Sequence, residues 1–338
     1  MNPNLTMFLK TISLALIFVF GLQVFGLQQT TQAQTVKNKT GKGETLAGTW
    51  EVLIESDRGD REGNLVIEKN GTQYAGKYVG TESGNERELT NLSMKKSSVA
   101  FGFQVEREGQ EIEFEFKAKL NGQHMEGTWS AFMEQTEVAS GSVTAVRQLE
   151  LSDFRGYSSE EVGAGWSMAD GVLHFDGNKC GDLITKQEFA NFVLEFEWKI
   201  SEAGNSGVMY RVSLGDKKPY KSGPEYQVLD DDKHKDGKLE SHRAGALYAL
   251  YVPKNKSLNP VGEWNSSKIV LNGNSVQHWL NGKKVVEAEL GSPDWIEKVN
   301  ASKFKTWEKF GKNKKGHLCF QDHGDPVWYR NIAIKALD

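Results

Sequence analysis

Hydrophobic and polar residues alternate along most of the chain from about residue 46 to its end. The alternation is cleanest in the segment IEFEFKA at 112–118, whose apolar residues share one face and whose charged residues share the other. A period of two is typical of strands with one buried face. Asn-Gly pairs, which favour the tight turn of a β-hairpin, begin at residues 70, 121, 272 and 281. The pattern therefore predicts an all-β protein built from antiparallel hairpins.

Residues 46–147 predict roughly seven or eight short strands. The segments NGTQYAGKY at 70–78 and NGQHMEGTW at 121–129 show weak internal sequence similarity. An open sheet of this size would expose unpaired edges, which closure removes. We therefore expect a small, lipocalin-like antiparallel β-barrel. The segment has no grouping of acid, base and nucleophile, so we expect it to be an accessory domain.

Residues 151–338 contain roughly a dozen further strand candidates and one predicted helix at 294–307. All of the nine Trp residues except Trp50 and Trp129 lie in this part. So many strands in a chain of this length favour a two-sheet jelly-roll sandwich. Aromatic rings on a curved sheet are suited to stacking on sugar rings.

The first residues have the three-part pattern of a secretory signal peptide. A basic residue precedes an apolar run at 12–27, and the small residues Thr31 and Ala33 follow it. The run is shorter than the about 20 apolar residues of a transmembrane helix. We expect cleavage after a signal peptide at 1–33, a polar linker at 34–45, and an exported bacterial protein, periplasmic or secreted, with no membrane segment after cleavage.

The charge balance and the cysteines exclude several classes of protein. The chain has 41 basic and 45 acidic residues, a net charge of −4, which argues against a dedicated nucleic-acid binder. Two cysteines, Cys180 and Cys319, are too few for a disulfide scaffold or a Cys-rich zinc site, and their spacing leaves open whether they pair. No dinucleotide-binding fingerprint is present, so we expect no hydride transfer.

The segment GPEYQVLD at 223–230 carries candidate chemistry. On a strand, Glu225 and Gln227 share a face, and Asp230 joins them only if a bulge shifts the register. The spacing is similar to the bulged carboxylate strand of jelly-roll glucanases, but Gln227 replaces the middle acid. That replacement argues against a two-carboxylate glycosidase. A polar edge of an ordinary strand remains an alternative.

A second candidate, QDHGDP at 321–326, follows an apolar strand. A His beside carboxylates can act as a general base or bind a metal, and a structural His–Asp pair is the alternative. The acidic run at 230–236 lacks the spacing of a calcium loop, so we expect a solvated loop.

In chain order, these motifs and several others resemble the 3-keto-disaccharide hydrolase domain family over about residues 151–338. The matching segments are TKQEFANFVLEFEWKI (185–200), GNSGV (204–208), EYQVLD (225–230), HRAGALY (242–248), GEWN (262–265), HWLNGK (278–283) and QDHGDPVWYRNI (321–332). The resemblance implies a concanavalin-like jelly roll, in agreement with the strand pattern, and an enzyme that acts on glycosides oxidised at carbon 3.

The implied reaction follows from the chemistry of the ketone. A carbonyl group at carbon 3 acidifies the proton on carbon 2, a base removes that proton, and the resulting enolate expels the aglycone from carbon 1. Addition of water to the unsaturated ketosugar then gives net hydrolysis. Such an enzyme needs a base, an acid for the leaving oxygen, and donors or a cation near the enolate oxygen.

The resemblance also implies site residues. The catalytic candidates are Glu225 or His323 as the base and Asp230 as the acid. We expect the other matching positions to bind substrate, with Gln321 and Arg330 at the carbonyl oxygen. These positions are Asn205, Gln227, His242, Arg243, Gln321, Asp322 and Arg330. A divalent metal held by Glu225, Asp322 or His323 would polarise the ketone, and the sequence leaves this open.

The expected partners are a 3-keto-glycoside substrate and a separate enzyme that oxidises the sugar at carbon 3. Two alternatives remain. The same fold serves in noncatalytic, lectin-like sugar-binding proteins, which would need aromatic and amide groups more than a base. An ordinary glycoside hydrolase is the other, and Gln227 argues against it.

Overall fold

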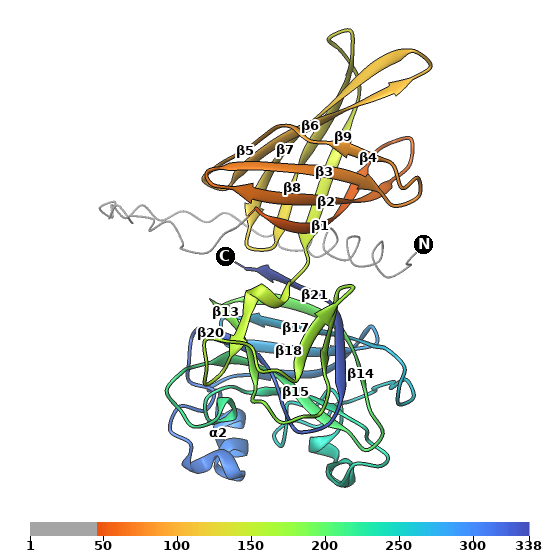
Figure 1. The fold of residues 1–338 in the computed structure, drawn as a ribbon. Helices are drawn as coiled ribbons and strands as arrows, with labels where there is room; N and C mark the ends of the chain where they lie inside the picture. The colour runs from red at the N-terminus through yellow and green to blue at the C-terminus, as the bar shows by residue number, and fades with distance from the viewer. Residues whose placement is uncertain (1–45, 338) are drawn as a thin grey trace, which may run out of the picture. The chain divides into compact units, whose positions relative to one another are not determined.

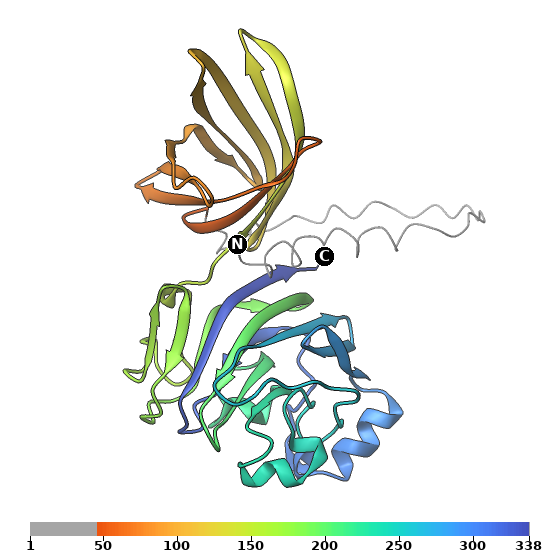
Figure 2. The ribbon, with the colours of Figure 1, turned by 90° about the vertical axis from the view of Figure 1, so that its right-hand side faces the viewer.

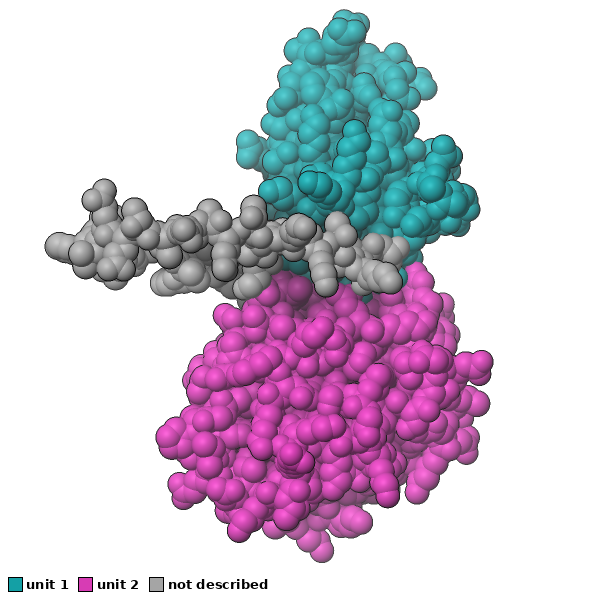
Figure 3. Space-filling model, turned by 90° about the vertical axis from the view of Figure 1, so that its left-hand side faces the viewer, with its two compact units in different colours: residues 1–147 teal, residues 148–338 magenta. Residues whose placement is uncertain are grey.

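The computed structural model describes residues 46–337, which form two compact units divided between Arg147 and Gln148 (Figures 1 and 3). The expected signal peptide and linker lie outside the described residues. No helix within the described part of the chain has the length and apolar character needed to cross a membrane. Both units consist mainly of antiparallel strands, as the alternating sequence predicts.

The first unit is a single nine-stranded sheet that curls into an almost closed barrel (Figures 1 and 2). Its strand order is β4-β3-β2-β1-β9-β8-β7-β6-β5. The two outermost strands, β4 and β5, are separated in sequence by Leu89 alone, so the sheet has to bend back on itself. The strands are β1 (Gly48–Glu55), β2 (Arg61–Asn70), β3 (Gln73–Gly80), β4 (Glu86–Glu88), β5 (Thr90–Lys95), β6 (Ser98–Arg107), β7 (Gln110–Asn121), β8 (His124–Met133) and β9 (Thr136–Arg147).

Aromatic side chains from neighbouring strands fill the barrel. Phe101 on β6 stacks on Phe116 on β7 with ring centroids 4.6 Å apart, and Phe103 stacks on Tyr78 of β3 at 5.0 Å. These rings come from the apolar positions of the alternating pattern, which the pleat directs to one face. The predicted Asn-Gly pairs all occupy hairpin turns, and their glycines have positive φ angles between 60° and 78°.

The second unit is a sandwich of two antiparallel sheets, which confirms the predicted jelly-roll class. One sheet has the order β10-β13-β20-β15-β16, and the other has the order β11-β12-β21-β14-β17-β18-β19. The five-stranded sheet contains β10 (Phe154–Gly156), β13 (Leu183–Phe189), β20 (Gly316–Phe320), β15 (Asn205–Val212) and β16 (Glu225–Leu229). The seven-stranded sheet contains β11 (Trp166–Ala169), β12 (Val172–Phe175), β21 (Val327–Ala336), β14 (Phe192–Ile200), β17 (Asn265–Asn272), β18 (Ser275–Leu280) and β19 (Lys283–Glu289).

The hydrophobic core lies between these two sheets. Tyr226 and Val228 on β16 point into it, and so do Val208 and Tyr210 on β15. Successive strand residues face opposite ways, so Glu225 and Gln227 lie on the outer face of the five-stranded sheet. We call this outer face, at the ends of β15, β16 and β20, the site face.

The single helix predicted at 294–307 is instead two short helices. The α-helix α2 (Pro293–Asn300) begins after Ser292, whose hydroxyl accepts a hydrogen bond from the backbone N–H of Trp295. A 3₁₀ helix, η5 (Lys303–Thr306), begins after Ser302, whose hydroxyl accepts from the N–H of Phe304. The second capping serine starts a new helix in place of continuing the first.

Candidate active site

Glu225 is the first residue of β16, and its carboxyl group is buried, with 8% of the residue exposed. Burial raises the pKa of Glu225 to about 8, and the charges of Asp182 and Asp236 add to this while Lys303 opposes it. No described residue donates a hydrogen bond to the carboxyl group. At neutral pH this side chain therefore holds a proton that it can donate.

Close approach between two strands positions Glu225. Its side chain lies against Gly207 on β15, where a Cβ atom would collide with Oε1. Gly207 is not in the left-handed region, so the absence of a side chain is what the site requires here. The backbone N–H of Gln321 donates to the Gly207 carbonyl at 2.9 Å, which ties β15 to the end of β20.

Lys303 is the cation beside Glu225. The backbone N–H of Tyr248 donates to the Glu225 carbonyl at 3.0 Å, and the Tyr248 ring lies beneath Lys303 Nζ, 4.4 Å from it. Lys303 Nζ also donates to the Tyr248 hydroxyl at 3.3 Å. Burial lowers the pKa of Lys303, while Glu225 and Asp236 raise it. The positive charge of Lys303 therefore favours the carboxylate form of Glu225.

A chain of polar side chains runs from β16 to His323. Gln227 Nε2 donates to Asn205 Oδ1 at 3.0 Å, and both residues are almost fully buried. Because Asn205 Oδ1 is an acceptor, its Nδ2 is the donor facing His323 Nε2 at 3.4 Å. His323 Nε2 is therefore the unprotonated nitrogen. At 3.4 Å this hydrogen bond is weak, so a substrate group can displace Asn205 from the single lone pair of His323 Nε2.

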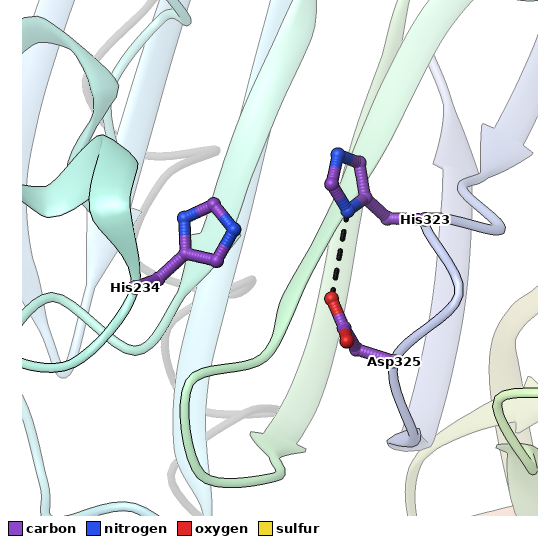
Figure 4. Close-up of side chains that lie close together, drawn as sticks. All are labelled: His234, His323 and Asp325. Carbon is purple, nitrogen blue, oxygen red and sulfur yellow. Dashed lines mark ion pairs between the residues drawn. The ribbon is translucent and has the colours of Figure 1, made fainter.

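Asp325 orients the other side of the His323 ring. His323 Nδ1 lies 3.5 Å from Asp325 Oδ2 (Figure 4). The same carboxylate oxygen accepts the backbone N–H of Asn205 at 3.1 Å. An imidazole with a carboxylate behind one nitrogen and a lone pair on the other has the arrangement of a general base.

Asp230 holds the loop after β16. Its Oδ2 accepts the N–H of Ala203 at 2.7 Å, and its Oδ1 accepts the N–H groups of Asp232 and Lys233. With both oxygens occupied and the residue 2% exposed, Asp230 is poorly placed to give a proton to substrate. The prediction that residues 230–236 form a solvated loop is wrong for the first two residues, since Asp230 is buried and Asp231 pairs with Lys256.

Gln321 and Asp322 follow β20 on the same side of the sandwich. Gln321 Oε1 and Asp322 Oδ1 are buried and have no hydrogen-bond partner among the described residues. Asp322 Oδ2 accepts the N–H groups of Cys180 and Gly181 at 2.8 and 2.7 Å. One oxygen of Asp322 therefore fixes a turn, and the other is free for a ligand.

His242 and Arg243 have different surroundings. The His242 ring packs on Tyr248 with centroids 4.5 Å apart, and its Nδ1 lies 3.7 Å from Asp236 Oδ2. Burial lowers the pKa of His242. With Lys303, it lines a cavity of about 380 Å³. Arg243 Nε donates to the Gly237 carbonyl at 2.8 Å, so this side chain holds the adjoining loop.

Arg330 is the predicted site residue that the structure does not bring to the site face. It lies on β21 of the seven-stranded sheet, next to Tyr329, which is in the core. Arg330 Nε donates to Glu197 Oε2 at 2.7 Å, and its guanidinium lies 4.1 Å from the centre of the Trp264 ring. Arg330 and Gln321 therefore cannot hold one carbonyl oxygen together, because Gln321 follows β20 of the five-stranded sheet and Arg330 lies on the seven-stranded sheet.

The structure adds residues that the motifs did not single out. Lys303 and Asp182 are isolated in the sequence, and His234 lies within the run that we expected to be a solvated loop. Burial raises the pKa of Asp182 to about 6, and its Oδ1 accepts the N–H of Asp322 at 3.0 Å. A buried acid before a strand gives no periodic signal, so only the fold reveals it.

His234, His323 and Asp325 form the one group of possible metal ligands found among the described residues (Figure 4). One ligand atom from each lies within 4.8 Å of the others. Of Glu225, Asp322 and His323, which the sequence left open as metal ligands, only His323 is part of this group. Cys180 and Cys319 are both free thiols.

Comparisons with known proteins identify the family of this chain. The family model described as a 3-keto-alpha-glucoside-1,2-lyase-like domain matches residues 115–335, so the match begins within β7 of the first unit. A 3-keto-disaccharide hydrolase of Bacteroides thetaiotaomicron is 34% identical over 266 residues, which cover 70% of this chain and 90% of the relative.

One solved structure adds to these matches. It is a proposed glycosyl hydrolase of Parabacteroides distasonis. Its sequence is 38% identical to this chain, and the TM-score is 0.53. The similarity covers 55% of this chain and 89% of that protein. Both the family model and the curated relative extend over most of the present chain. The chain belongs to the family of 3-keto-alpha-glucoside-1,2-lyase-like domains.

Proposed function

We propose that this protein is a carbohydrate hydrolase that cleaves 3-keto-glycosides by removing the proton on carbon 2 and eliminating the aglycone. The observation that carries the proposal is that the site face presents both a proton donor, Glu225, and a proton acceptor, His323. Glu225 holds a proton because burial raises its pKa to about 8, and His323 has a lone pair on Nε2 with Asp325 behind it.

In the first step, His323 Nε2 takes the proton from carbon 2, and the electrons of that bond form the enolate at carbon 3. Asp325 stabilises the imidazolium that results. The buried amides of Asn205 and Gln227 lie beside His323 and help to orient the sugar. The base therefore acts on a proton that only the ketone makes acidic.

In the second step, the enolate collapses, the bond between carbon 1 and the aglycone oxygen breaks, and Glu225 protonates that oxygen. Glu225 is then a carboxylate and can take a proton from water as the water adds to carbon 1. Carbon 2 recovers a proton from the His323 imidazolium. Both side chains return to their first protonation states, and the sum is hydrolysis of the glycosidic bond.

These roles differ from those that the resemblance implied. Glu225 takes the role of the acid because its proton is retained at neutral pH, and His323 takes that of the base. Asp230 has no free oxygen and positions the loop. The name of the 34% identical relative supports the 3-keto-disaccharide as the substrate class.

The proposal places this enzyme within a sequence of reactions. A ketone at carbon 3 has to be introduced by an oxidation, and this chain has no dinucleotide-binding fingerprint. We therefore propose that a separate sugar-oxidising enzyme supplies the substrate. The signal-peptide pattern at 1–33 supports export to the periplasm or the medium as part of the same proposal.

The test uses the purified protein with a 3-keto-glucoside and the matching unoxidised glucoside, each with and without a chelator. We expect aglycone release from the keto form alone. Release from the unoxidised glucoside at an equal rate would support an ordinary glycoside hydrolase. Saturable binding without release from either would support a noncatalytic sugar-binding protein. Loss of release with the chelator would add a metal requirement.

A further inference from the structure

His234 faces the proposed base from the loop after β16. It lies at the N-terminal cap of the 3₁₀ helix η3 (Lys235–Lys238), and its Nδ1 accepts the backbone N–H of Asp236 at 3.1 Å. A backbone N–H can only donate, so Nδ1 must be the nitrogen without a proton. A neutral His234 therefore carries its proton on Nε2.

The second ring nitrogen of His234 is turned toward His323 (Figure 4). The two rings meet edge to face, with centroids 5.9 Å apart and planes at 80°. The hydrogen bonds thus fix opposite tautomers in the two rings. His234 presents Nε2–H, and His323 presents the lone pair of its Nε2.

We propose that His234 is a further catalytic residue, which donates a hydrogen bond from Nε2 of a neutral ring to the oxygen on carbon 3 as that oxygen becomes an enolate. This inference rests on the proposed function. The carbon that loses its proton and the carbon that bears the oxygen are neighbours, so a base and a donor that face each other suit the two atoms. The proton stays on Nε2 throughout, and the negative charge stays on the substrate until the aglycone leaves.

The hydrogen bond to Nδ1 favours the neutral form of His234. A doubly protonated ring has no lone pair on Nδ1 to accept the backbone N–H of Asp236. A neutral donor is suited to an enolate because it stabilises the charge without delivering a proton to the oxygen, which would stop elimination.

The same three groups are close enough to share a metal ion, but the tautomer of His234 opposes this. A metal on Nε2 needs that nitrogen free of its proton, which would then have to move to Nδ1. A proton on Nδ1 would then point at the backbone N–H of Asp236, so two hydrogen-bond donors would face each other. The donor role satisfies all of these hydrogen bonds.

The first test needs no substrate. In the full-length protein labelled with ¹⁵N-histidine, and assigned with the His234→Gln variant, we expect NMR to show His234 protonated on Nε2 and unprotonated on Nδ1 at neutral pH. A ring protonated on Nδ1 would overturn the proposal. So would loss of activity on chelation, restored by Zn²⁺ or Mn²⁺, if the His234→Gln change also weakens binding of that metal.

The second test compares variants on a 3-keto-glucoside. His234→Ala should lower kcat by about 10²–10³-fold with a smaller change in KM, because the donor acts mainly on the developing charge. His234→Gln keeps an N–H donor and should recover part of the loss. Lys238→Gln, at an exposed residue of the same 3₁₀ helix, serves as the matched control and should leave kcat unchanged.

The outcomes separate this inference from the proposed function. If the wild-type protein releases no aglycone from the keto substrate, both proposals fail. If the wild-type protein is active and His234→Ala retains its kcat, only the role of His234 is overturned.

Discussion

The two outer faces of the second unit both carry charged and aromatic side chains, but they differ in how fully those groups are paired. On the seven-stranded sheet, Arg330 pairs with Glu197 at 2.7 Å, and Lys268 pairs with Glu195 at 2.7 Å. Cations also cover its aromatic rings: Lys199 Nζ lies 4.9 Å from the centre of the Trp328 ring. Most polar groups of this face are paired in this way, although the buried Nε2 of His174 on β12 has no hydrogen-bond partner among the described residues.

The site face of the five-stranded sheet has the opposite character. Glu225 accepts no hydrogen bond from a described residue, and buried oxygens of Gln227, Gln321 and Asp322 have no partner among the described residues. Leaving a buried polar group without a hydrogen bond costs stability. Several such groups close together therefore point to a ligand that supplies the missing hydrogen bonds. The site face thus gathers more unmet hydrogen-bonding capacity than the outer face of the seven-stranded sheet, and this excess, more than charge itself, marks the candidate active site.

The largest expected effect comes from removing the base on the site face. His323→Ala should lower kcat/KM on a 3-keto-glucoside by about 10²–10⁴-fold, since a positioned general base contributes that much. Asp325→Asn should lower kcat by less, because the base remains but loses the carboxylate that orients it. Steady-state kinetics on both variants check this, and full activity of His323→Ala would rule out the assigned base.

Removing the acid should change both the rate and its pH dependence. Since Glu225 must be protonated, wild-type activity should fall as the pH rises through about 8. Glu225→Gln keeps the shape of the side chain but has no proton to donate, so kcat should fall by about 10²-fold or more and this alkaline limb should disappear. If Glu225→Gln shows the same loss of activity at high pH, a group other than Glu225 causes that loss.

The same shift affects stability. The folded-state pKa of Glu225 lies above its unfolded value of 4.5, so its contribution is fully present below pH 4.5 and is lost as the pH rises toward about 8. The free energy of unfolding should therefore fall across this window by a few kcal/mol more in the wild type than in Glu225→Gln. Denaturant unfolding at several pH values measures this, and parallel curves would contradict the buried, protonated acid.

A smaller effect should come from the strand beneath the acid. Gly207→Ala places a Cβ atom against Glu225 Oε1, which should displace the carboxyl group and lower kcat by roughly 10-fold, with a loss of about 1–3 kcal/mol in stability. In the Glu225→Gln background, the same change should reduce kcat little further. An equal reduction in both backgrounds would show that Gly207 acts independently of Glu225.

The smallest effect on catalysis should come from the paired face. Arg330→Gln removes the partly buried ion pair between Arg330 and Glu197 and should lower the melting temperature, yet kcat should stay within about twofold of the wild type. Thermal unfolding and kinetics on the same sample separate the two effects. A large loss of kcat at unchanged KM would contradict this prediction and indicate that Arg330 takes part in catalysis.

The sequence was sufficient to predict the features that depend on local pattern. Alternation identified the strands and placed Glu225 and Gln227 on one face, and the Asn-Gly pairs marked the hairpin turns. It could not assign Arg330 to its sheet, because β20 and β21 are joined by a short turn yet belong to different sheets. That choice depends on pairing with strands distant in the sequence.

The roles within the site depended on contacts that have no sequence signal. Asp230 looked like an acid until its oxygens were seen to accept three backbone N–H groups. His234 looked like a residue of a solvated loop until the N–H of Asp236 fixed its tautomer. Protonation states follow from burial and hydrogen-bond geometry, which only the folded chain supplies.

The central claim is that the proton on carbon 2 is removed during cleavage, and its most direct test is a 3-keto-glucoside deuterated at that carbon. The account predicts slower aglycone release from the deuterated substrate and a keto sugar product that carries solvent hydrogen at carbon 2. Aglycone release at an unchanged rate, with the deuterium fully retained in the product, would contradict it.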